Sequence, residues 1–364
     1  MVIYEWLWRS NSQHRSRRFL LLHIAYNLGL LLFFKYFNFF IDSAKLALNS
    51  IGLGGDFTVL QVLLPVGISF YTFQSIAYAV DIYRGKTQPV DRLLLFAAFI
   101  SFFPQLVAGP IERSQHLLPQ LRDPPRFEFR FIQEGLVLLL VGFFKKIFVA
   151  NHCAMVADYF FKGSGQTSAG WVVLGTLAFA FQIYGDFSGY TDIARGSARM
   201  FGVRLSQNFR FPYFAKGPSD FWNRWHVSLS TWIRDYLYIP LGGNRGTPGQ
   251  TIRNLYLSML LAGLWHGAAW NFVLWGAFHA TVLAAYRLLP PLARLEQARS
   301  WRSPLAVLAM FVLTLVGWLI FRAPSFEFVR HAEMKNNQIG GVTQRAAQHD
   351  LLPTSAKSRH GEID

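Results

Sequence analysis

The sequence predicts an all-α, polytopic integral membrane protein, and three observations support this class. Hydrophobic residues make up 52% of the 364 residues and charged residues only 15%, whereas a soluble domain carries roughly a quarter charged residues. Aromatic residues reach 16%, and aromatic rings suit lipid-facing surfaces and the membrane interface. Several apolar stretches also approach the roughly 20 residues that a helix needs to cross a bilayer.

Basic residues dominate the charge, with a formal net charge of +15, but their placement does not indicate nucleic acid as a partner. A nucleic-acid-binding protein gathers its basic residues on one folded polar face. Here they lie between apolar stretches, as Arg17 and Arg18 do before the first one, where they set topology and meet anionic headgroups. Residues 1–18 are therefore expected to form a basic N-terminal segment.

Eight apolar stretches are the candidate membrane helices, and they cover residues 19–41, 59–80, 93–108, 134–151, 171–194, 254–270, 271–286 and 304–321. The third is short, and only Asn271 divides the sixth from the seventh. Such segments predict re-entrant helices, which are tolerated where protein or a water-filled cavity covers their backbone. Residues 19–324 are thus expected to form one membrane domain. Residues 325–364 are polar and aperiodic, which predicts a disordered tail.

A helix of a different kind, amphipathic rather than apolar, is predicted over residues 221–239. Its apolar residues recur at every third or fourth position, which is the spacing of one helix face. Pro240 marks its end. The opposite face carries Arg224 and Asp235, which are expected to support a site or to position a substrate.

His266 is the leading candidate for a catalytic residue. It is the one ionisable histidine in an apolar run that extends from Leu255 to Trp270, and an ionisable group at membrane depth usually faces a cavity or a partner. Gly263 and Gly267 flank it, and small residues permit a substrate or another helix to approach the backbone. A neutral histidine that is hydrogen-bonded within the bundle is the structural alternative. The glycines and the adjacent Trp265 favour the functional interpretation.

His226 is the second candidate. Asn223 lies one helical turn before it and Ser230 one turn after it, so these polar neighbours are expected to share its face and to fix its tautomer. An ordinary interface histidine is the alternative. His279 is a conceivable third metal ligand, but no Glu or Cys lies within a turn of any of the three histidines, so no metal site is predicted.

Two carboxylates lie within or just beyond the stretch at 171–194. Asp186 is expected to pair with a buried cation or to orient a histidine, and Asp192 is expected to act as a site residue or as an interfacial salt-bridge partner. The spacing of Gly185 and Gly189 is typical of close helix packing.

The adjacent Lys145 and Lys146 are expected to extend towards a headgroup layer, or alternatively to bind phosphates of an acyl donor. The chain contains no G-x-S-x-G elbow and no G-x-x-x-x-G-K-[ST] loop. A covalent acyl-enzyme and nucleotide phosphoryl transfer are therefore not indicated.

Six motifs together resemble the bacterial membrane-bound O-acyltransferases, and most closely those that acetylate alginate. They are SFYTFQSIAYAVDIYRG (69–85), FFPQLVAGPIER (102–113), FQIYGDFSGYTDIA (181–194), NFRFPY (208–213), FWNRWHVSLSTWIRDYLYIPLGGNR (221–245) and GLWHGAAWNFVLWG (263–276). The resemblance extends in the same order from about residue 20 to residue 325. It implies a ring of tilted and re-entrant helices around a central funnel. Family members usually begin with additional helices, which this chain is expected to lack.

The resemblance also implies an activity and a site. The histidine of the LWHG motif and that of the RWH motif are the family's site residues, and they correspond to His266 and His226. His266 is expected to act as general base on an acceptor hydroxyl that attacks a thioester, and His226 to stabilise the oxyanion or position the acceptor. The residues expected to support them are Asp186, Asp192, Asn223, Arg224, Ser230, Asp235 and Trp265.

The expected reaction is O-acetyl transfer in the bacterial inner membrane, from a cytoplasmic thioester such as acetyl-CoA to hydroxyls of an exported polysaccharide such as alginate. No permanently bound cofactor is expected, and periplasmic acetylation proteins are the expected partners. D-alanyl transfer to teichoic acid is the nearest alternative. A transporter or a non-catalytic scaffold is the alternative from another class, because broken helices and buried charges also suit a solute pathway.

Overall fold

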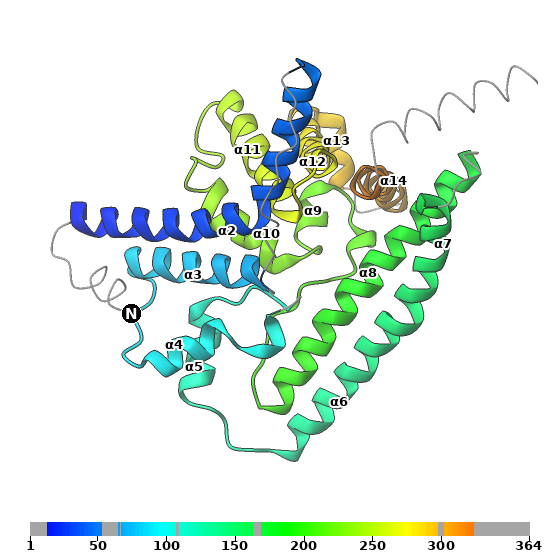
Figure 1. The fold of residues 1–364 in the computed structure, drawn as a ribbon. Helices are drawn as coiled ribbons and strands as arrows, with labels where there is room; N and C mark the ends of the chain where they lie inside the picture. Colours follow the sequence, from blue (N-terminus) through cyan, green and yellow to red (C-terminus); the bar gives the residue numbers. More distant parts are fainter. Residues whose placement is uncertain are drawn as a thin grey trace, which may run out of the picture.

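The structure, a computed structural model, describes residues 13–52, 65, 67–106, 109–162, 169–297 and 302–323. All regular elements in these ranges are helical (Figure 1), which confirms the all-helical prediction. Residues 1–12 of the predicted basic segment and the predicted tail at 325–364 lie outside the described residues.

The helices follow one another as α2 (Gln13–Ser50), α3 (Ile68–Tyr83), α4 (Leu93–Ile100), η1 (Phe103–Gln105), α5 (Ser114–Arg122), α6 (Phe129–Phe143), η2 (Phe144–Ala150), α7 (Asn151–Lys162), α8 (Ala169–Met200), η3 (Pro212–Phe214), α9 (Pro218–Trp222), α10 (Val227–Ile233), η4 (Arg234–Tyr238), α11 (Pro248–His266), α12 (Trp270–Leu288), α13 (Pro290–Glu296) and α14 (Arg302–Arg322). The elements η1 and η3 are 3₁₀ turns, and η2 and η4 are π-helical.

Three helical segments among the described residues are long and apolar enough to cross a membrane: Ser16–Ser50, Phe129–Lys162 and Ser303–Arg322. A fourth span arises if α12 and α13, which meet at a bend of 99°, are counted together. The predicted stretch at 93–108 is short in the structure too, with eight residues in α4 and three in η1. The eight predicted apolar stretches thus correspond to a few long helices, shorter apolar ones and a sharply bent pair among the described residues.

The longest helical unit is a hairpin in which α6, η2 and α7 run alongside α8 (Figure 1). Glycines set the distance between the two arms. A Cβ on Gly142 would lie 2.7 Å from the carbonyl oxygen of Gly189, and one on Gly135 would lie 2.8 Å from that of Gly196. The expectation that Gly189 serves close packing is confirmed, because only glycine leaves room for the backbones to approach so closely.

Ion pairs also join the two arms of this hairpin. Lys145 lies 2.6 Å from a carboxylate oxygen of Asp192, and Lys146 pairs with Asp186. Both lysines therefore have a partner within the hairpin, and their expected extension towards a headgroup layer stays a prediction. A carboxylate on the facing helix satisfies each ammonium within the protein, where an unpaired charge at membrane depth would be costly.

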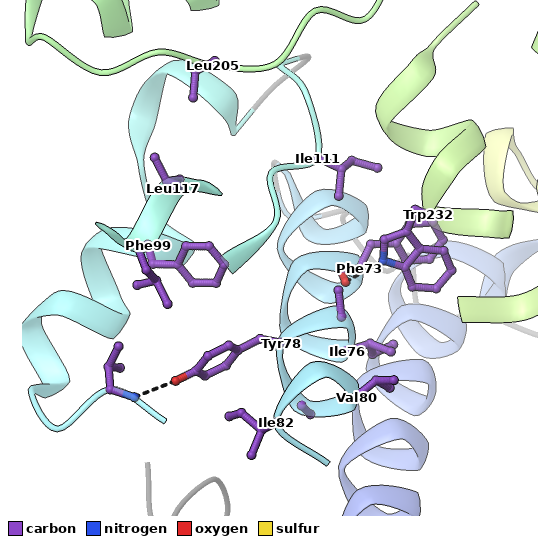
Figure 2. Packing of buried hydrophobic residues seen from close by; sticks show 14 of the residues in the cluster. Phe73, Ile76, Tyr78, Val80, Ile82, Phe99, Ile111, Leu117, Leu205 and Trp232 are labelled. Atoms are coloured by element: carbon purple, nitrogen blue, oxygen red, sulfur yellow. Dashed lines mark hydrogen bonds between the residues drawn. The ribbon is translucent and has the colours of Figure 1, made fainter. Parts of the chain in front are cut away.

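A first hydrophobic core surrounds α3, and Figure 2 shows part of it. The ring of Trp232, on α10, stacks on that of Phe73 with centroids 4.0 Å apart, and its indole N–H donates to the Phe73 carbonyl oxygen at 2.9 Å. Tyr78 is 1% exposed and its hydroxyl accepts a hydrogen bond from the backbone N–H of Val90. The Trp232 indole nitrogen and the Tyr78 hydroxyl thus each have a partner, as is usual for buried polar groups.

A second core, rich in aromatic rings, lies between α8, α9, α12 and α14. It includes Phe179, Phe221, Trp225, Trp275 and Trp318, all of which are buried. The short segment from α9 to α10 connects the two cores, because Trp225 belongs to the second and Leu229 and Trp232 belong to the first. This segment carries His226.

The amphipathic helix predicted over 221–239 is not continuous. The chain forms α9, breaks, forms α10 and continues into the π-helical η4. The break is at His226, whose φ of 42° is left-handed, a conformation that interrupts a right-handed helix. Asn208 holds the new start, because its backbone oxygen accepts from the Val227 N–H at 3.0 Å and its Oδ1 from the Ser228 N–H at 3.2 Å.

Candidate functional site

His266 is the last residue of α11, and the chain reverses directly after it. Gly267 is fully extended and α12 begins at Trp270. A Cβ on Gly263 would lie 2.1 Å from the Phe272 carbonyl oxygen, and one on Gly267 would lie 2.2 Å from the Phe272 ring. The expectation that these glycines permit the close approach of another helix is confirmed, and the turn places His266 where α11 and α12 meet.

Aromatic rings surround the imidazole of His266. Its centroid lies 5.0 Å from that of Trp265, 5.1 Å from that of Trp275 and 5.3 Å from that of Phe321. The imidazole lines a cavity of about 330 Å³ between the two cores. Most of the lining is aromatic, and the residues are Lys35, Ser69, Phe70, Ile183, Phe187, Trp225, Trp265, His266, Trp275, Trp318 and Phe321.

His226 lies beside this cavity and is 1% exposed. Its ring contacts two residues that line the cavity, with centroids 4.6 Å from Phe187 and 6.0 Å from Trp265. Neither of its ring nitrogens has a hydrogen-bond partner in the part of the chain that the structure describes. Buried polar atoms are normally hydrogen-bonded, so the two ring nitrogens of His226 are exceptions among the described residues.

The two polar neighbours expected to fix the tautomer of His226 do not contact its ring. The Ser230 hydroxyl donates to the Trp225 carbonyl oxygen at 3.0 Å. Asn223 is exposed and lies on the far side of the helix break. The break separates Asn223 from His226, because residues one turn apart share a face only in a continuous helix. Ser230 stays one turn after His226, whose carbonyl oxygen accepts its N–H at 2.9 Å, but its hydroxyl is engaged by Trp225.

The two aspartates of α8 are engaged with cations and do not line the cavity. Asp186 pairs with Lys146, which is one of the two roles expected for it. Asp192 pairs with Lys145 at 2.6 Å and with Arg195 at 3.1 Å. The structure therefore places both carboxylates in the packing of the hairpin.

The two charged residues expected on the polar face of the broken helix also form ion pairs away from the cavity lining. Arg224 lies 2.6 Å from Asp220. Asp235 lies 3.2 Å from Arg113 and 2.9 Å from Arg234. Of the expected supporting residues, Trp265 is the one that the structure places in the cavity wall.

Lys35 is a cavity residue that the sequence analysis missed. It comes from α2, donates a hydrogen bond to the Trp265 carbonyl oxygen and lies 5.3 Å from the centroid of the Trp265 ring. The available signal was an ionisable side chain within the apolar stretch at 19–41. That is the same rule that identified His266.

His279 is buried near the other two histidines, among aromatic rings. Its centroid lies 4.7 Å from that of Trp275 and 5.2 Å from that of Trp222. The described residues contain no group of three or more His, Cys, Asp or Glu side chains placed to hold a metal ion. The side chains of the site offer imidazoles that can accept a proton, a lysine amino group and largely aromatic walls.

Comparison with known proteins matches residues 92–327 to a family model described as "MBOAT, membrane-bound O-acyltransferase family". The chain is 47% identical to the probable alginate O-acetylase AlgI of Azotobacter vinelandii over 312 residues, which is 86% of this chain and 61% of that protein. It is 36% identical to the peptidoglycan O-acetyltransferase of Helicobacter pylori over 338 residues, covering 86% and 63%. Identity to the teichoic acid D-alanyltransferase of Bacillus subtilis is 28% over 281 residues, covering 72% and 69%. The chain thus spans about three fifths of the length of the first two relatives.

Proposed function

The chain belongs to the membrane-bound O-acyltransferase family, and we propose that it transfers acetyl groups from a cytoplasmic thioester, acetyl-CoA, to hydroxyls of an exported polysaccharide such as alginate. The observation that carries this proposal is a cavity lined by His266, with His226 beside it, whose ring nitrogens have no partner among the described residues. Acyl transfer to a hydroxyl needs a proton acceptor in an enclosure that excludes water.

His266 acts as the general base in this proposal. It accepts the proton of the acceptor hydroxyl as the oxygen attacks the thioester carbonyl carbon, and then passes that proton to the departing thiolate. The surrounding rings of Trp265, Trp275 and Phe321 keep competing water away from the reacting atoms. Hydrolysis of the thioester is thereby disfavoured relative to transfer.

His226 positions the acceptor or the developing oxyanion in this scheme. Its ring is fixed by Phe187 and by the left-handed backbone that Asn208 holds. A ring that cannot rotate freely offers its N–H in a constant direction, which is what electrostatic stabilisation of a transition state requires.

The acetyl group is favoured over D-alanine because identity falls from 47% for an alginate O-acetylase and 36% for a peptidoglycan O-acetyltransferase to 28% for a D-alanyltransferase. We propose a polysaccharide acceptor because these two O-acetylating relatives are named for alginate and peptidoglycan. We place the protein in the bacterial cytoplasmic membrane, with acetylation proteins of the periplasm as its partners.

Radiolabelled acetyl transfer tests the proposal. Membranes that contain the full chain would be incubated with [¹⁴C]acetyl-CoA and alginate, and base-labile label would be measured in the recovered polysaccharide. The parent protein is expected to transfer label, and His266→Ala to reduce the rate by about 10²- to 10⁴-fold, which is the usual contribution of a general base.

His152→Ala is the matched control, because this histidine is exposed on α7 and bonds the Phe148 carbonyl oxygen outside the cavity. It is expected to leave the rate unchanged. A parental rate in a normally inserted His266→Ala protein would overturn the assignment. Transfer from a D-alanyl carrier thioester in place of acetyl-CoA would identify the other acyl group, and solute uptake without ester formation would identify a transporter.

A further inference from the structure

Lys35 brings an ionisable amino group to the His266 cavity. Among the described residues that line the cavity it is the one lysine or arginine. It lies in the apolar helix α2, about 230 positions before Trp265, whose carbonyl oxygen accepts its hydrogen bond. A lysine inside an apolar helix is costly, so its retention needs a reason.

The contacts of Lys35 fix its ammonium group next to His266. The acceptor is the carbonyl of the residue immediately before His266, at the C-terminal end of α11. Carbonyls at this end of a helix lack intrahelical partners and carry partial negative charge. An ammonium has three N–H donors, and the described residues provide one hydrogen-bond acceptor for it.

Capping α11 does not by itself account for a charge at this position. The next residue, Tyr36, donates to the neighbouring Leu264 carbonyl oxygen, is 6% exposed and does not line the cavity. A neutral donor thus already performs the same task beside it. Lys145 and Lys146 each have a carboxylate partner, whereas Lys35 has none among the described residues.

We propose that Lys35 is a catalytic residue, whose ammonium group stabilises the negative charge on the carbonyl oxygen of the thioester during acyl transfer. This inference rests on the proposed function. The acceptor oxygen forms a bond to the carbonyl carbon while His266 takes its proton, and the carbonyl electron pair moves to the oxygen that faces Lys35. When the pair returns, the carbon–sulfur bond breaks and the thiolate receives the proton from His266.

Four variants separate the effect of the positive charge from the effect of the hydrogen bond to the C-terminal end of α11. Lys35→Met removes both, Lys35→Gln keeps a donor for the Trp265 carbonyl without the charge, and Lys35→Arg keeps the charge. Tyr36→Phe is the matched control, since it removes an equivalent hydrogen bond to α11 outside the cavity. Initial rates with acetyl-CoA and alginate, and the melting temperature in detergent, would be measured for each.

Lys35→Met and Lys35→Gln are expected to lower kcat by about 10²-fold or more, as loss of an oxyanion donor does, with little change in KM for acetyl-CoA. Lys35→Arg is expected to keep part of the rate, and Tyr36→Phe nearly all of it. With fluoroacetyl-CoA, whose oxyanion is stabilised by its own substituent, the loss in Lys35→Gln is expected to be smaller.

A parental rate in Lys35→Gln would overturn the inference, because the hydrogen bond without the charge would then suffice. The same holds if Lys35→Gln and Tyr36→Phe lose rate and melting temperature equally. If Lys35→Met fails to fold, the rates of Lys35→Gln and Lys35→Arg still show whether the positive charge is needed. If His266→Ala remains inactive while Lys35→Gln is active, only the role of Lys35 fails. If the parent protein itself transfers no acetyl label to alginate, the proposed function fails.

Discussion

The long hairpin and the histidine cavity treat buried polar groups in opposite ways. In the hairpin, Lys145 and Lys146 of η2 each have a carboxylate partner on α8. Beside the cavity, both ring nitrogens of His226 lack a partner among the described residues, and the described residues that line the cavity with Lys35 include no carboxylate. The difference indicates that ionisable groups have two roles in this protein. Paired groups hold helices together, and unpaired ones are kept for a substrate.

Among the substitutions that test this comparison, the one at His226 is expected to have the largest effect, and the effect is on the acetyl-transfer rate. Asparagine tolerates the left-handed backbone at this position better than most residues, so His226→Asn removes the imidazole without straining the chain. The acetyl-transfer rate is expected to fall by about 10²- to 10³-fold, while the melting temperature in detergent changes little. An active variant, or one whose rate falls only in proportion to the folded fraction, would place His226 with the structural residues.

The next effect concerns stability rather than rate, and it is in the hairpin. Leucine at position 142 would place a side chain against the Gly189 carbonyl oxygen, which lies 2.7 Å from a Cβ there. Gly142→Leu is expected to cost about 2–3 kcal/mol of stability through overpacking, with the rate per folded molecule preserved. Gly170→Leu on α8 is the control, since a Cβ there meets nothing within 4 Å. Equal melting temperatures for the two variants would contradict the packing argument.

A smaller loss is expected when one hairpin ion pair is opened. Asp192→Asn leaves Lys145 and Arg195 without their carboxylate, and we expect it to cost about 1–2 kcal/mol because the pair is partly buried. Thermal unfolding of Asp192→Asn, Lys145→Met and the double variant forms a thermodynamic cycle. The sum of the stability losses in the two single variants is expected to exceed the stability loss in the double variant. Additive losses would show that the pair contributes nothing of its own.

The smallest effect is a pH dependence outside the membrane spans, at the start of α5. His116 Nδ1 lies 2.6 Å from a carboxylate oxygen of the buried Glu112, and this hydrogen bond raises the pKa of His116 above its ordinary value. A raised pKa in the folded state means that the contribution is complete below the unfolded pKa, near about 6.5, and is lost as the pH rises through the folded pKa.

Because 45% of the His116 side chain is exposed, solvent screening limits this contribution to less than about 1 kcal/mol. Melting temperatures of the parent and His116→Gln, recorded from pH 5.5 to pH 8.5, are expected to converge as the pH rises. Parallel curves would show that the pair does not titrate in this range.

How far the sequence predicts the fold depends on whether the information is local. The apolar stretch at 304–321 becomes α14 almost residue for residue, because a run of apolar residues without breakers is helical in any apolar surrounding. The break at His226 is different. It depends on Asn208, a tertiary partner from another part of the chain, and a periodicity of apolar residues contains no information about such a contact.

The same difference between local sequence information and tertiary contacts applies to the candidate site. His266 was predicted because a histidine in an apolar run is conspicuous, and the structure places it in the wall of a cavity. For Asp186 and Asp192 the sequence left two roles open, a cation pair or a place in the site, and the lysines of η2 pair with both carboxylates. Ranking ionisable residues by how apolar their surroundings are does not reveal which of them meet in space. Lys35 and His266 lie far apart in the sequence and share one cavity.

The π-helical segment η2 determines how the small-residue face of α7 is oriented relative to that of α6. The small buried residues of this arm, Gly135, Gly142, Ala150 and Ala157, are separated by seven, eight and seven positions. The extra position falls within η2 (Phe144–Ala150), where a π turn accommodates one additional residue. If the same residues formed a regular α-helix without the π turn, the extra residue would rotate the small side chains of α7 by about 100° relative to those of α6. The π turn thus lets both halves of the arm present their small side chains to the same neighbour.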